Sequence, residues 1–173
     1  MFMFFERKLY MTLFLCGFMG CGKTTVGKLA AKKLGCSFFD SDDLIVEKLG
    51  MSIPDIFAEK GEPYFRSVEA DIIRSLCGKK AVVACGGGAM LNEGSAKAAA
   101  ASGEVIFLDV DFETCYSRIC GDSNRPIAAS STKEELRQRF ELRREIYLKH
   151  STIQIDSSGS PMKTVELIAD AVR

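Results

Sequence analysis

The sequence lacks a surplus of charge of either sign. Lysine plus arginine equals aspartate plus glutamate at 23 each, so the formal net charge is zero. A protein that binds nucleic acid or a membrane surface usually carries a basic field, and the composition provides none. We therefore expect a small-molecule partner, with no nucleic acid and no membrane.

Metal-binding and disulfide motifs are also missing. The chain has one histidine, His150, and its seven cysteines include no CxxC pair and no metal-like cluster with that histidine. Such cysteines are typical of reduced thiols in the cytoplasm, which is the expected location. The segment 1–10 is apolar, but Arg7 and Lys8 come too late in it for a secretory signal. Because the first predicted strand begins after this segment, residues 1–10 are a possible N-terminal extension.

The order of apolar runs predicts an α/β fold. At 173 residues the chain fits one domain, 1–173, with one active site. Short buried runs alternate with helical patterns, as in domains with a parallel sheet. The predicted strands are 13–16, 37–39, 81–84, 105–108 and 153–155. The predicted helices are 23–34, 42–49, 63–76, 96–101, 112–120, 133–149 and 162–172, with Thr132 as an N-cap and Gly35 as a C-cap.

Two stretches do not fit this alternation. The region 40–76 is long enough to build a pocket for an acceptor. The region 118–132 includes a polar stretch with glycine and proline, placed where a mobile lid would close over a ligand. We therefore expect an acceptor-binding region and a lid beside the sheet.

The most informative motif is Gly17-Phe18-Met19-Gly20-Cys21-Gly22-Lys23-Thr24, between the first predicted strand and a helix. It has the pattern of a P-loop, in which glycines let backbone N–H groups surround the β- and γ-phosphates at a helix N-terminus. Lys23 supplies a mobile positive charge, and the Thr24 hydroxyl is a ligand for Mg²⁺. The chain is therefore predicted to bind a nucleoside triphosphate. Cys21 is most simply a small space-filling side chain, although a thiol there could make activity sensitive to oxidation.

Two carboxylates follow the second predicted strand. Asp40 and Asp42 lie at its carboxyl end, the edge where open α/β sheets bind ligands and where the P-loop also lies. We predict that Asp40 belongs to the outer shell of the metal and that Asp42 holds or deprotonates an acceptor hydroxyl. The alternative is that Asp40-Ser41-Asp42 only caps a helix.

The triplet Gly86-Gly87-Gly88 directly follows the third predicted strand. A loop without side chains lets the backbone come close to a ligand, and ordering three glycines has an entropic cost that a plain turn avoids. We therefore predict a ligand contact here, with a flexible connector as the alternative.

Three arginines are candidates for binding an anionic acceptor: Arg66 in the region 40–76, Arg125 in the lid and Arg143 in the helix beyond it. Guanidinium groups bind carboxylate or phosphate through paired hydrogen bonds. Each arginine could instead be a solvated surface residue. The helix 133–149 is most simply a solvated face over an apolar stripe, and His150 at its end most simply interacts with the last carbonyls.

Together these motifs resemble the shikimate kinase family, within the nucleoside monophosphate kinase fold. The resemblance covers nearly the whole chain after residue 11, with the motifs in the family's order. They are the P-loop, the Asp-x-Asp element 40–42, the acceptor segment 61–69, the glycine triplet, Arg118, Asn124-Arg125-Pro126 and the segment 143–147. The resemblance implies a three-layer P-loop kinase fold with a five-stranded parallel sheet in the order 2-3-1-4-5.

The resemblance also implies an activity and roles for single residues. The chain would transfer the γ-phosphoryl group of ATP to the 3-hydroxyl of shikimate, in chorismate and aromatic amino acid biosynthesis, with Mg²⁺ as cofactor, and it is expected to be a monomer. The implied catalytic residues are Lys23, Asp42 and Arg125. The implied substrate-binding residues are Asp42, Phe57, Phe65, Arg66, Gly87, Gly88 and Arg143. The implied ATP-binding residues are Gly20, Cys21, Gly22, Lys23, Thr24, Thr25, Arg118, Arg125 and Pro161, with Thr24 and Asp40 at the metal.

The chain departs from the family pattern in three places. Glu145 and Ile146 interrupt the usual Arg-x-Pro-Leu-Tyr element, so Arg144 competes with Arg143 for the acceptor carboxylate. The loop 156–161 lacks an arginine that some members place near adenine, and the lid is short. One alternative is another small-molecule kinase of this fold, acting on gluconate or a nucleoside monophosphate. The other is a nucleotide-dependent switch, which would carry an Asn/Thr-Lys-x-Asp element that this sequence does not have.

Overall fold

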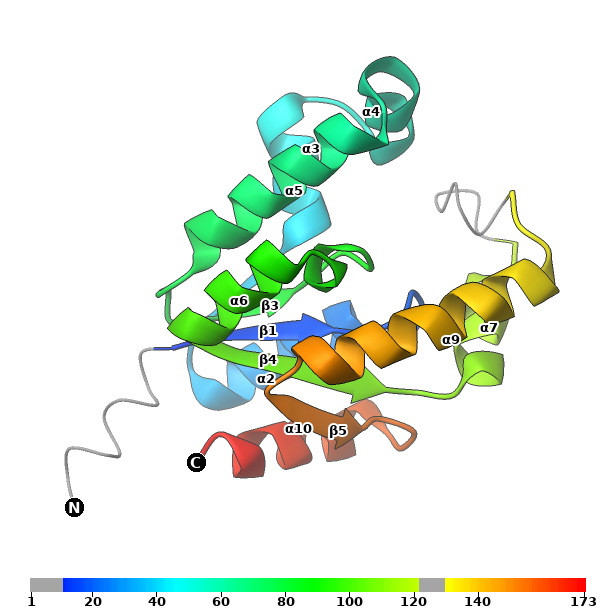
Figure 1. Ribbon diagram of the computed structural model, residues 1–173. Helices are drawn as coiled ribbons and strands as arrows, with labels where there is room; N and C mark the ends of the chain where they lie inside the picture. The colour runs from blue at the N-terminus through cyan, green and yellow to red at the C-terminus, as the bar shows by residue number, and fades with distance from the viewer. Residues whose placement is uncertain (1–10, 122–129) are drawn as a thin grey trace.

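A five-stranded parallel sheet organises residues 11–121 and 130–173, which are the residues that this computed structural model describes (Figure 1). Its strand order is β2-β3-β1-β4-β5, which confirms the predicted order. The strands are β1 (Thr12–Cys16), β2 (Ser37–Asp40), β3 (Ala81–Ala84), β4 (Gly103–Asp109) and β5 (Ile153–Asp156).

The central strands are buried along their length because helices cover both faces of the sheet. Every residue of β1 and β3 is buried, and the two strands pair in the register Thr12↔Ala81 to Leu15↔Ala84. Strands covered on both faces appear in a sequence as continuous apolar runs, which is why these runs were visible without a structure.

Two helices cover one face and a second group covers the other (Figure 1). The pair α2 (Lys23–Leu34) and α10 (Pro161–Ala171) pack against each other on one face. On the other face lie α6 (Glu93–Ser102) and α9 (Lys133–His150), with α7 (Phe112–Ile119) beside α9. Within residues 11–121 and 130–173, no helix combines the length and apolar character that crossing a membrane requires.

The acceptor region 40–76 folds into a helical projection that stands beyond one edge of the sheet (Figure 1). It consists of α3 (Ser41–Leu49), α4 (Ile53–Lys60) and α5 (Glu62–Leu76). The long helix α5 packs against α6, so the projection is joined to the main body along its base.

The predicted elements agree with the structure except in two short segments. Helix α4 was not predicted, although Ser52 caps it by accepting a hydrogen bond from the Asp55 N–H and a proline occupies its first turn. A 3-10 turn, η2 (Ala89–Leu91), also follows the glycine triplet. The predicted caps are confirmed: Thr132 forms a capping box with α9, and Gly35 ends α2 with a left-handed conformation.

Candidate active site

A cleft of about 280 Å³ lies at the carboxyl edge of the sheet. Because parallel strands end together at this edge, the loops after β1, β2 and β3 meet there. The cleft is lined by Met19, Gly20, Gly22, Lys23, Thr24, Thr25, Asp40, Asp42, Ala84, Cys85, Gly86, Gly87 and Arg118. The structure therefore brings together the P-loop, the two carboxylates and the glycine triplet, which the sequence places up to 70 residues apart.

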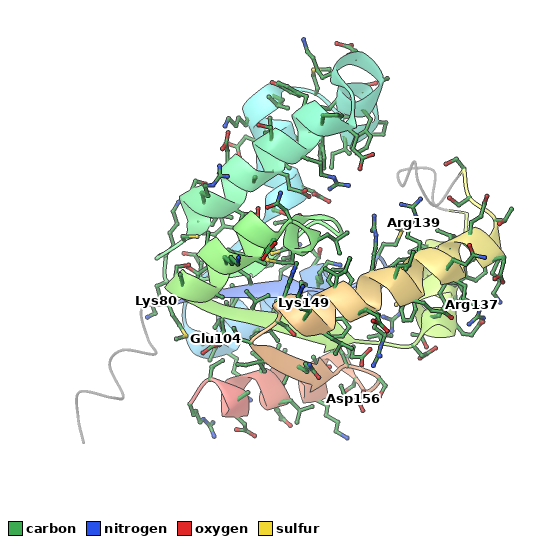
Figure 2. The ribbon with its side chains drawn as sticks, in the orientation of Figure 1. Lys80, Glu104, Arg137, Arg139, Lys149 and Asp156 are labelled. Atoms are coloured by element: carbon green, nitrogen blue, oxygen red, sulfur yellow. The ribbon has the colours of Figure 1, made fainter. Side chains whose placement is uncertain are left out.

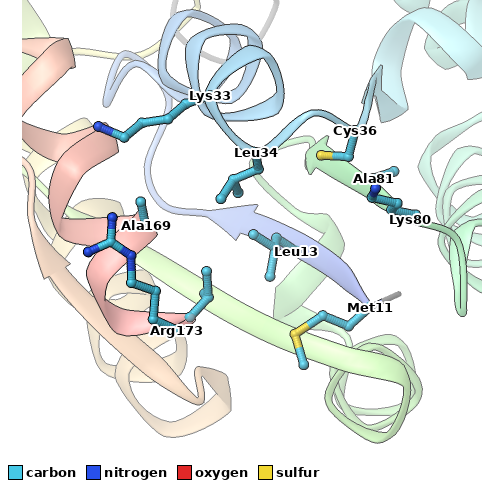
Figure 3. Close-up of a pocket in the computed structure, with 10 residues that line it drawn as sticks. Met11, Leu13, Lys33, Leu34, Cys36, Lys80, Ala81, Ala169 and Arg173 are labelled. Carbon is cyan, nitrogen blue, oxygen red and sulfur yellow. The ribbon is translucent and has the colours of Figure 1, made fainter. Parts of the chain in front are cut away.

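A second cavity of about 320 Å³ lies near the opposite ends of the strands (Figure 3). Apolar side chains and three cationic residues, Lys33, Lys80 and Arg173, line it. Lys33 lies in the last turn of α2, where positive charge complements the helix dipole. Among the described residues, its lining includes no carboxylate and none of the P-loop residues. The chemistry of phosphoryl transfer therefore belongs to the first cleft.

The P-loop leaves the N-terminus of α2 available to an anion. Gly20 and Gly22 have φ values of 83° and 94°, a left-handed conformation that favours glycine. A Cβ atom on Gly20 would lie 2.6 Å from the backbone oxygen of Cys115, so a side chain does not fit there. Within this fully described helix, the first turn of α2 has no acidic residue and no side-chain cap. Its free N–H groups and positive dipole end are therefore suited to phosphate.

Lys23 folds back over the loop. Its Nζ atom donates to the carbonyl oxygens of Gly17 and Phe18 at 2.8 and 3.1 Å, and it lies 3.6 Å from the Cys21 sulfur. The ammonium group is thus held at the mouth of the loop by weak neutral acceptors. A phosphate oxygen would be a stronger, charge-assisted acceptor at the same place.

Asp40 connects the P-loop helix with α3. Its Oδ2 atom accepts a hydrogen bond from the Thr24 hydroxyl at 2.9 Å, and its Oδ1 atom accepts one from the Asp42 N–H at 3.0 Å. Asp40 is therefore the N-cap of α3, which the sequence analysis kept as an alternative, and it also contacts the predicted metal ligand. The capping interpretation is confirmed, and the role of Asp40 at the metal stays a prediction.

Asp42 presents a carboxylate oxygen with no partner. Its Oδ1 atom is buried and, within the described residues, has no hydrogen bond. Burial is the main reason that the pKa of Asp42 rises to about 6, and the neighbouring Asp40 carboxylate raises it further, against Lys23 and Arg66, which lower it. A carboxylate with this pKa is ionised at neutral pH and is a better proton acceptor than an exposed aspartate.

Glu69 is a buried carboxylate that forms an ion pair with Arg66. The Glu69 Oε2 atom accepts from Arg66 Nη1 at 2.8 Å, and the side chain is only 4% exposed. Burial raises the pKa of Glu69, and the Arg66 guanidinium works in the other direction. On its other side, Arg66 pairs with Glu62 at 3.1 Å. The two glutamates therefore fix the direction of the guanidinium.

The glycine triplet provides space for these charged side chains. A Cβ atom on Gly86 would lie 2.5 Å from Asp42 Oδ1 and 3.0 Å from Glu69 Oε1, and one on Gly88 would lie 2.2 Å from Arg66 Nη1. None of the three glycines has a positive φ. From the sequence, we predicted that the triplet lets a ligand approach the backbone. The structure adds a different reason for glycine, because protein side chains already occupy the space that a Cβ atom would need.

The two candidate arginines of α9 have different environments. Arg144 pairs with Asp109 at the end of β4, with Nε–Oδ1 and Nη2–Oδ2 distances of 3.1 and 2.5 Å. Arg143 is 9% exposed and faces the glycine triplet, where its Nη1 atom would lie 3.7 Å from a Cβ atom on Gly87. Burial lowers the pKa of Arg143. One turn later, the Tyr147 hydroxyl donates to the Gly87 carbonyl oxygen and anchors the helix to the loop.

These observations were compared with known proteins. A sequence model described as shikimate kinase matches residues 19–173. The chain belongs to the shikimate kinase family. The shikimate kinase of Persephonella marina is 42% identical over 93% of this chain and 98% of its own length, and that of Streptococcus gordonii is 42% identical over 94% and 99%. The solved structure of shikimate kinase from Acinetobacter baumannii in complex with shikimate has a TM-score of 0.87 and 32% identity, covering 96% of this chain and 97% of that chain.

The family and the sheet order expected from the sequence are thereby confirmed. The remaining site residues have the following positions in this shikimate kinase fold. Phe57 and Phe65 pack with their ring centroids 4.8 Å apart, and Arg118 Nη1 donates to the Gly20 carbonyl at 2.9 Å. Cys21 is buried beneath the P-loop, and Pro161 opens α10 outside the cleft lining. Arg125 lies outside the described residues, as does most of the predicted lid.

Sequence reasoning missed two members of this shikimate kinase site and misplaced a third residue. Glu69 was not recognised, although its place three residues after Arg66 on a helix signals an ion pair. The buried Ser41 accepts a hydrogen bond from the Gly86 N–H at 2.8 Å and ties the triplet to α3. The prediction for His150 was wrong: its Nδ1 atom lies 2.8 Å from the Met90 carbonyl in η2, rather than interacting with the last carbonyls of its own helix.

Proposed function

We propose that this chain transfers the γ-phosphoryl group of ATP to the 3-hydroxyl of shikimate, giving shikimate 3-phosphate and ADP. The observation that carries the proposal is the position of Asp42, whose unpartnered oxygen lies in one cleft with the P-loop. Membership of the shikimate kinase family, and the solved relative in complex with shikimate, support this acceptor. The product would then enter chorismate and aromatic amino acid biosynthesis.

On the nucleotide side, the P-loop and the first turn of α2 would hold the phosphates. Gly20, Gly22 and the first residues of α2 line this part of the cleft, so backbone N–H groups at the helix N-terminus would bind the phosphates. Lys23 would exchange its two carbonyl partners for β- and γ-oxygens. Arg118 lies at the mouth of the loop, where adenine would stack beside it. The assignments of Arg125 to the transferring phosphoryl group and of Pro161 to adenine stay predictions from the sequence.

The Thr24 hydroxyl and the Asp40 carboxylate fit a divalent metal. They are oxygen donors 2.9 Å apart at the phosphate end of the cleft, and hard oxygen ligands favour Mg²⁺. Thr24 would be a direct ligand and Asp40 would hold the metal's water. When bound, Mg²⁺ supplies positive charge that offsets the charge on the β- and γ-oxygens.

On the acceptor side, charge and shape suit a small hydroxylated carboxylate. Arg143, which is buried and forms no ion pair among the described residues, would bind the carboxylate together with Arg66. The pairing of Arg144 with Asp109 supports Arg143 for this role. The backbone at Gly87 and Gly88 would contact the ring hydroxyls, and the rings of Phe57 and Phe65, tilted by 46° to each other, would form a wall.

Asp42 would act as the base. The proton of the acceptor hydroxyl passes to a carboxylate oxygen of Asp42 while the hydroxyl oxygen bonds to the γ-phosphorus and the bond to the ADP oxygen breaks. Lys23 holds the charge that moves onto the phosphoryl oxygens. Glu69 contacts neither reactant in this scheme and acts by keeping Arg66 in place.

We also propose that the protein is a cytoplasmic monomer with a single domain. All seven cysteines are free thiols, and Cys120 is exposed, which suits a reducing compartment.

The proposal is tested by coupling ADP release to a fluorescence or absorbance readout with Mg·ATP and five acceptors: shikimate, quinate, gluconate, AMP and CMP. Turnover with shikimate and background rates with the others are expected. Turnover with gluconate or a nucleotide would show that the pocket binds a different acceptor. ADP release at the same rate with and without each acceptor would favour a nucleotide-dependent switch.

A further inference from the structure

Helix α9 carries four arginines, and they fall into two groups. Arg137 pairs with Glu113, and Arg144 pairs with Asp109. Among the described residues, Arg139 and Arg143 have no ion pair or hydrogen bond with a carboxylate. Figure 2 places Arg139 on the side of α9 that faces the helical projection and Arg137 on the opposite side, as expected for helix positions two residues apart.

Arg139 lies on the same face of α9 as two residues of the site, and we call this face the arginine stripe. Arg139, Arg143 and Tyr147 are spaced by four residues, so their side chains lie on one face of α9. Tyr147 contacts the Gly87 carbonyl at the base of the cleft, and Arg143 faces Gly87 from the next turn. Exposure rises along the stripe from 1% at Tyr147 to 9% at Arg143, and Arg139 is exposed. Arg139 therefore lies about 6 Å further along the helix from Arg143, on the same face and nearer to solvent.

Positive charge gathers around Arg143. Burial is the main cause of its lowered pKa, and the positive charges of Arg139 and Arg66 lower it further. The carboxylate one turn before Arg139 is Glu135, whose Oε2 atom accepts hydrogen bonds from the Thr132 N–H and hydroxyl and whose pKa the charge of Arg139 helps to lower. An incoming carboxylate would relieve this repulsion, and Arg139 is the first of the three cations that it would meet.

We propose that Arg139 is the outer member of an arginine pair that draws the acceptor's carboxylate into the cleft and passes it to Arg143. This inference rests on the proposed function and adds a positioning residue to it. Arg139 acts on capture of the anionic acceptor, because a charge at the mouth of a cleft raises the local concentration and association rate of an oppositely charged ligand. It takes no part in phosphoryl transfer or in ATP binding.

The test compares Arg139→Gln with Arg137→Gln, which removes the same charge from the same helix on the face away from the cleft. For Arg139→Gln we expect the KM for shikimate to rise roughly threefold to tenfold, with kcat and the KM for ATP unchanged. The dependence of kcat/KM for shikimate on ionic strength should weaken, because salt screens attraction that the variant no longer has. Arg139→Lys should restore most of the affinity, and Arg137→Gln should resemble the wild type throughout.

Several outcomes would overturn the inference. One is an unchanged shikimate KM and salt dependence in Arg139→Gln. Others are an equal change in Arg137→Gln, or a change confined to kcat or to the KM for ATP. A wild-type protein that does not use shikimate would instead overturn the proposed function itself. Thermal unfolding of each variant checks folding, and Arg139→Ala removes the same charge if the glutamine variant is unstable.

Discussion

At the scale of single residues, Asp42 combines two properties that a structural aspartate would not need. Its Oδ1 atom is buried without a partner among the described residues, and its pKa is raised to about 6. Leaving a buried carboxylate unpaired costs free energy that a hydrogen bond would offset. Such a cost is typical of a group that is kept ready for a ligand.

The Asp42→Asn variant should therefore lose turnover while keeping its nucleotide site. We expect kcat to fall about 10²- to 10⁴-fold, the usual contribution of a general base, and the dissociation constant for Mg·ATP to stay close to that of the wild type. Steady-state kinetics and calorimetric titration with ATP measure the two quantities. Loss of ATP affinity would place Asp42 in the nucleotide site instead.

The raised pKa of Asp42 also predicts the pH profile. Below pH 6 the carboxylate is protonated in the free enzyme and cannot accept the hydroxyl proton. The value of kcat/KM for shikimate should therefore fall tenfold per pH unit below about pH 6. An acid limb near pH 4, where ordinary aspartates titrate, would contradict the role or the environment assigned to Asp42.

The residues found from the sequence are those whose chemistry appears in a local motif. The P-loop, Asp42 and the glycine triplet each follow a strand, so parallel topology alone predicts that they meet. The spacing of Glu69 from Arg66 is compatible with an ion pair, but the sequence does not show that Glu69 is buried beside Gly86, which is what makes it part of the site. Side chains that position other side chains are visible only in three dimensions.

At the scale of secondary-structure elements, the loop after β3 can lie close to the side chains of helix α5 because its glycines have no side chains. Gly88→Ala should displace the Arg66 guanidinium, because the added Cβ atom would lie 2.2 Å from its Nη1 atom while the backbone at Gly88 is already in a right-handed helical conformation. The expected effect is an increase of roughly tenfold in the KM for shikimate, about 1.4 kcal/mol of binding free energy, with ATP binding unchanged.

Gly87→Ala is the matched comparison. Its Cβ atom would meet only Arg143 Nη1, at an ordinary contact distance of 3.7 Å. We expect a smaller rise in the shikimate KM than for Gly88→Ala. Equal effects of the two alanines would indicate that the loop's flexibility, rather than the space for Arg66, is what the glycines provide.

All five strands were predicted to within two residues at each end. The central strands β1 and β3 are the clearest, because buried parallel strands are continuous apolar runs. Helix α4 was missed because eight residues give too few turns for a clear period, and Pro54 resembles a helix breaker unless the Ser52 cap is recognised first. The capping residues of a helix are present in this segment, but it is too short to show the apolar periodicity of one.

At the scale of the whole molecule, the same carboxylate that favours catalysis reduces stability at neutral pH. The folded-state pKa of Asp42 is raised from 3.8 to about 6, so between these values the folded state binds more protons than the unfolded state. Its contribution to the free energy of unfolding therefore falls as the pH rises from about 4 to about 6. Glu69, whose pKa is also raised, contributes in the same direction.

Asp42→Asn should remove most of this dependence. We expect the variant to be more stable than the wild type at pH 7 and above, by at most about 3 kcal/mol, and the difference to shrink toward pH 4. Urea unfolding at a series of pH values measures it. Parallel curves for the two proteins would mean that the Asp42 carboxylate is solvated in the folded state.

The central claim is that one cleft moves a phosphoryl group from ATP to a hydroxyl of shikimate, with Asp42 as the base. Phosphorus NMR of the wild-type protein and Asp42→Asn, each with Mg·ATP and shikimate, tests it most directly. We expect one new phosphate monoester signal in the wild-type sample, equal in amount to the ADP formed, and almost none with Asp42→Asn. Formation of ADP together with inorganic phosphate, and no monoester, would contradict transfer to shikimate.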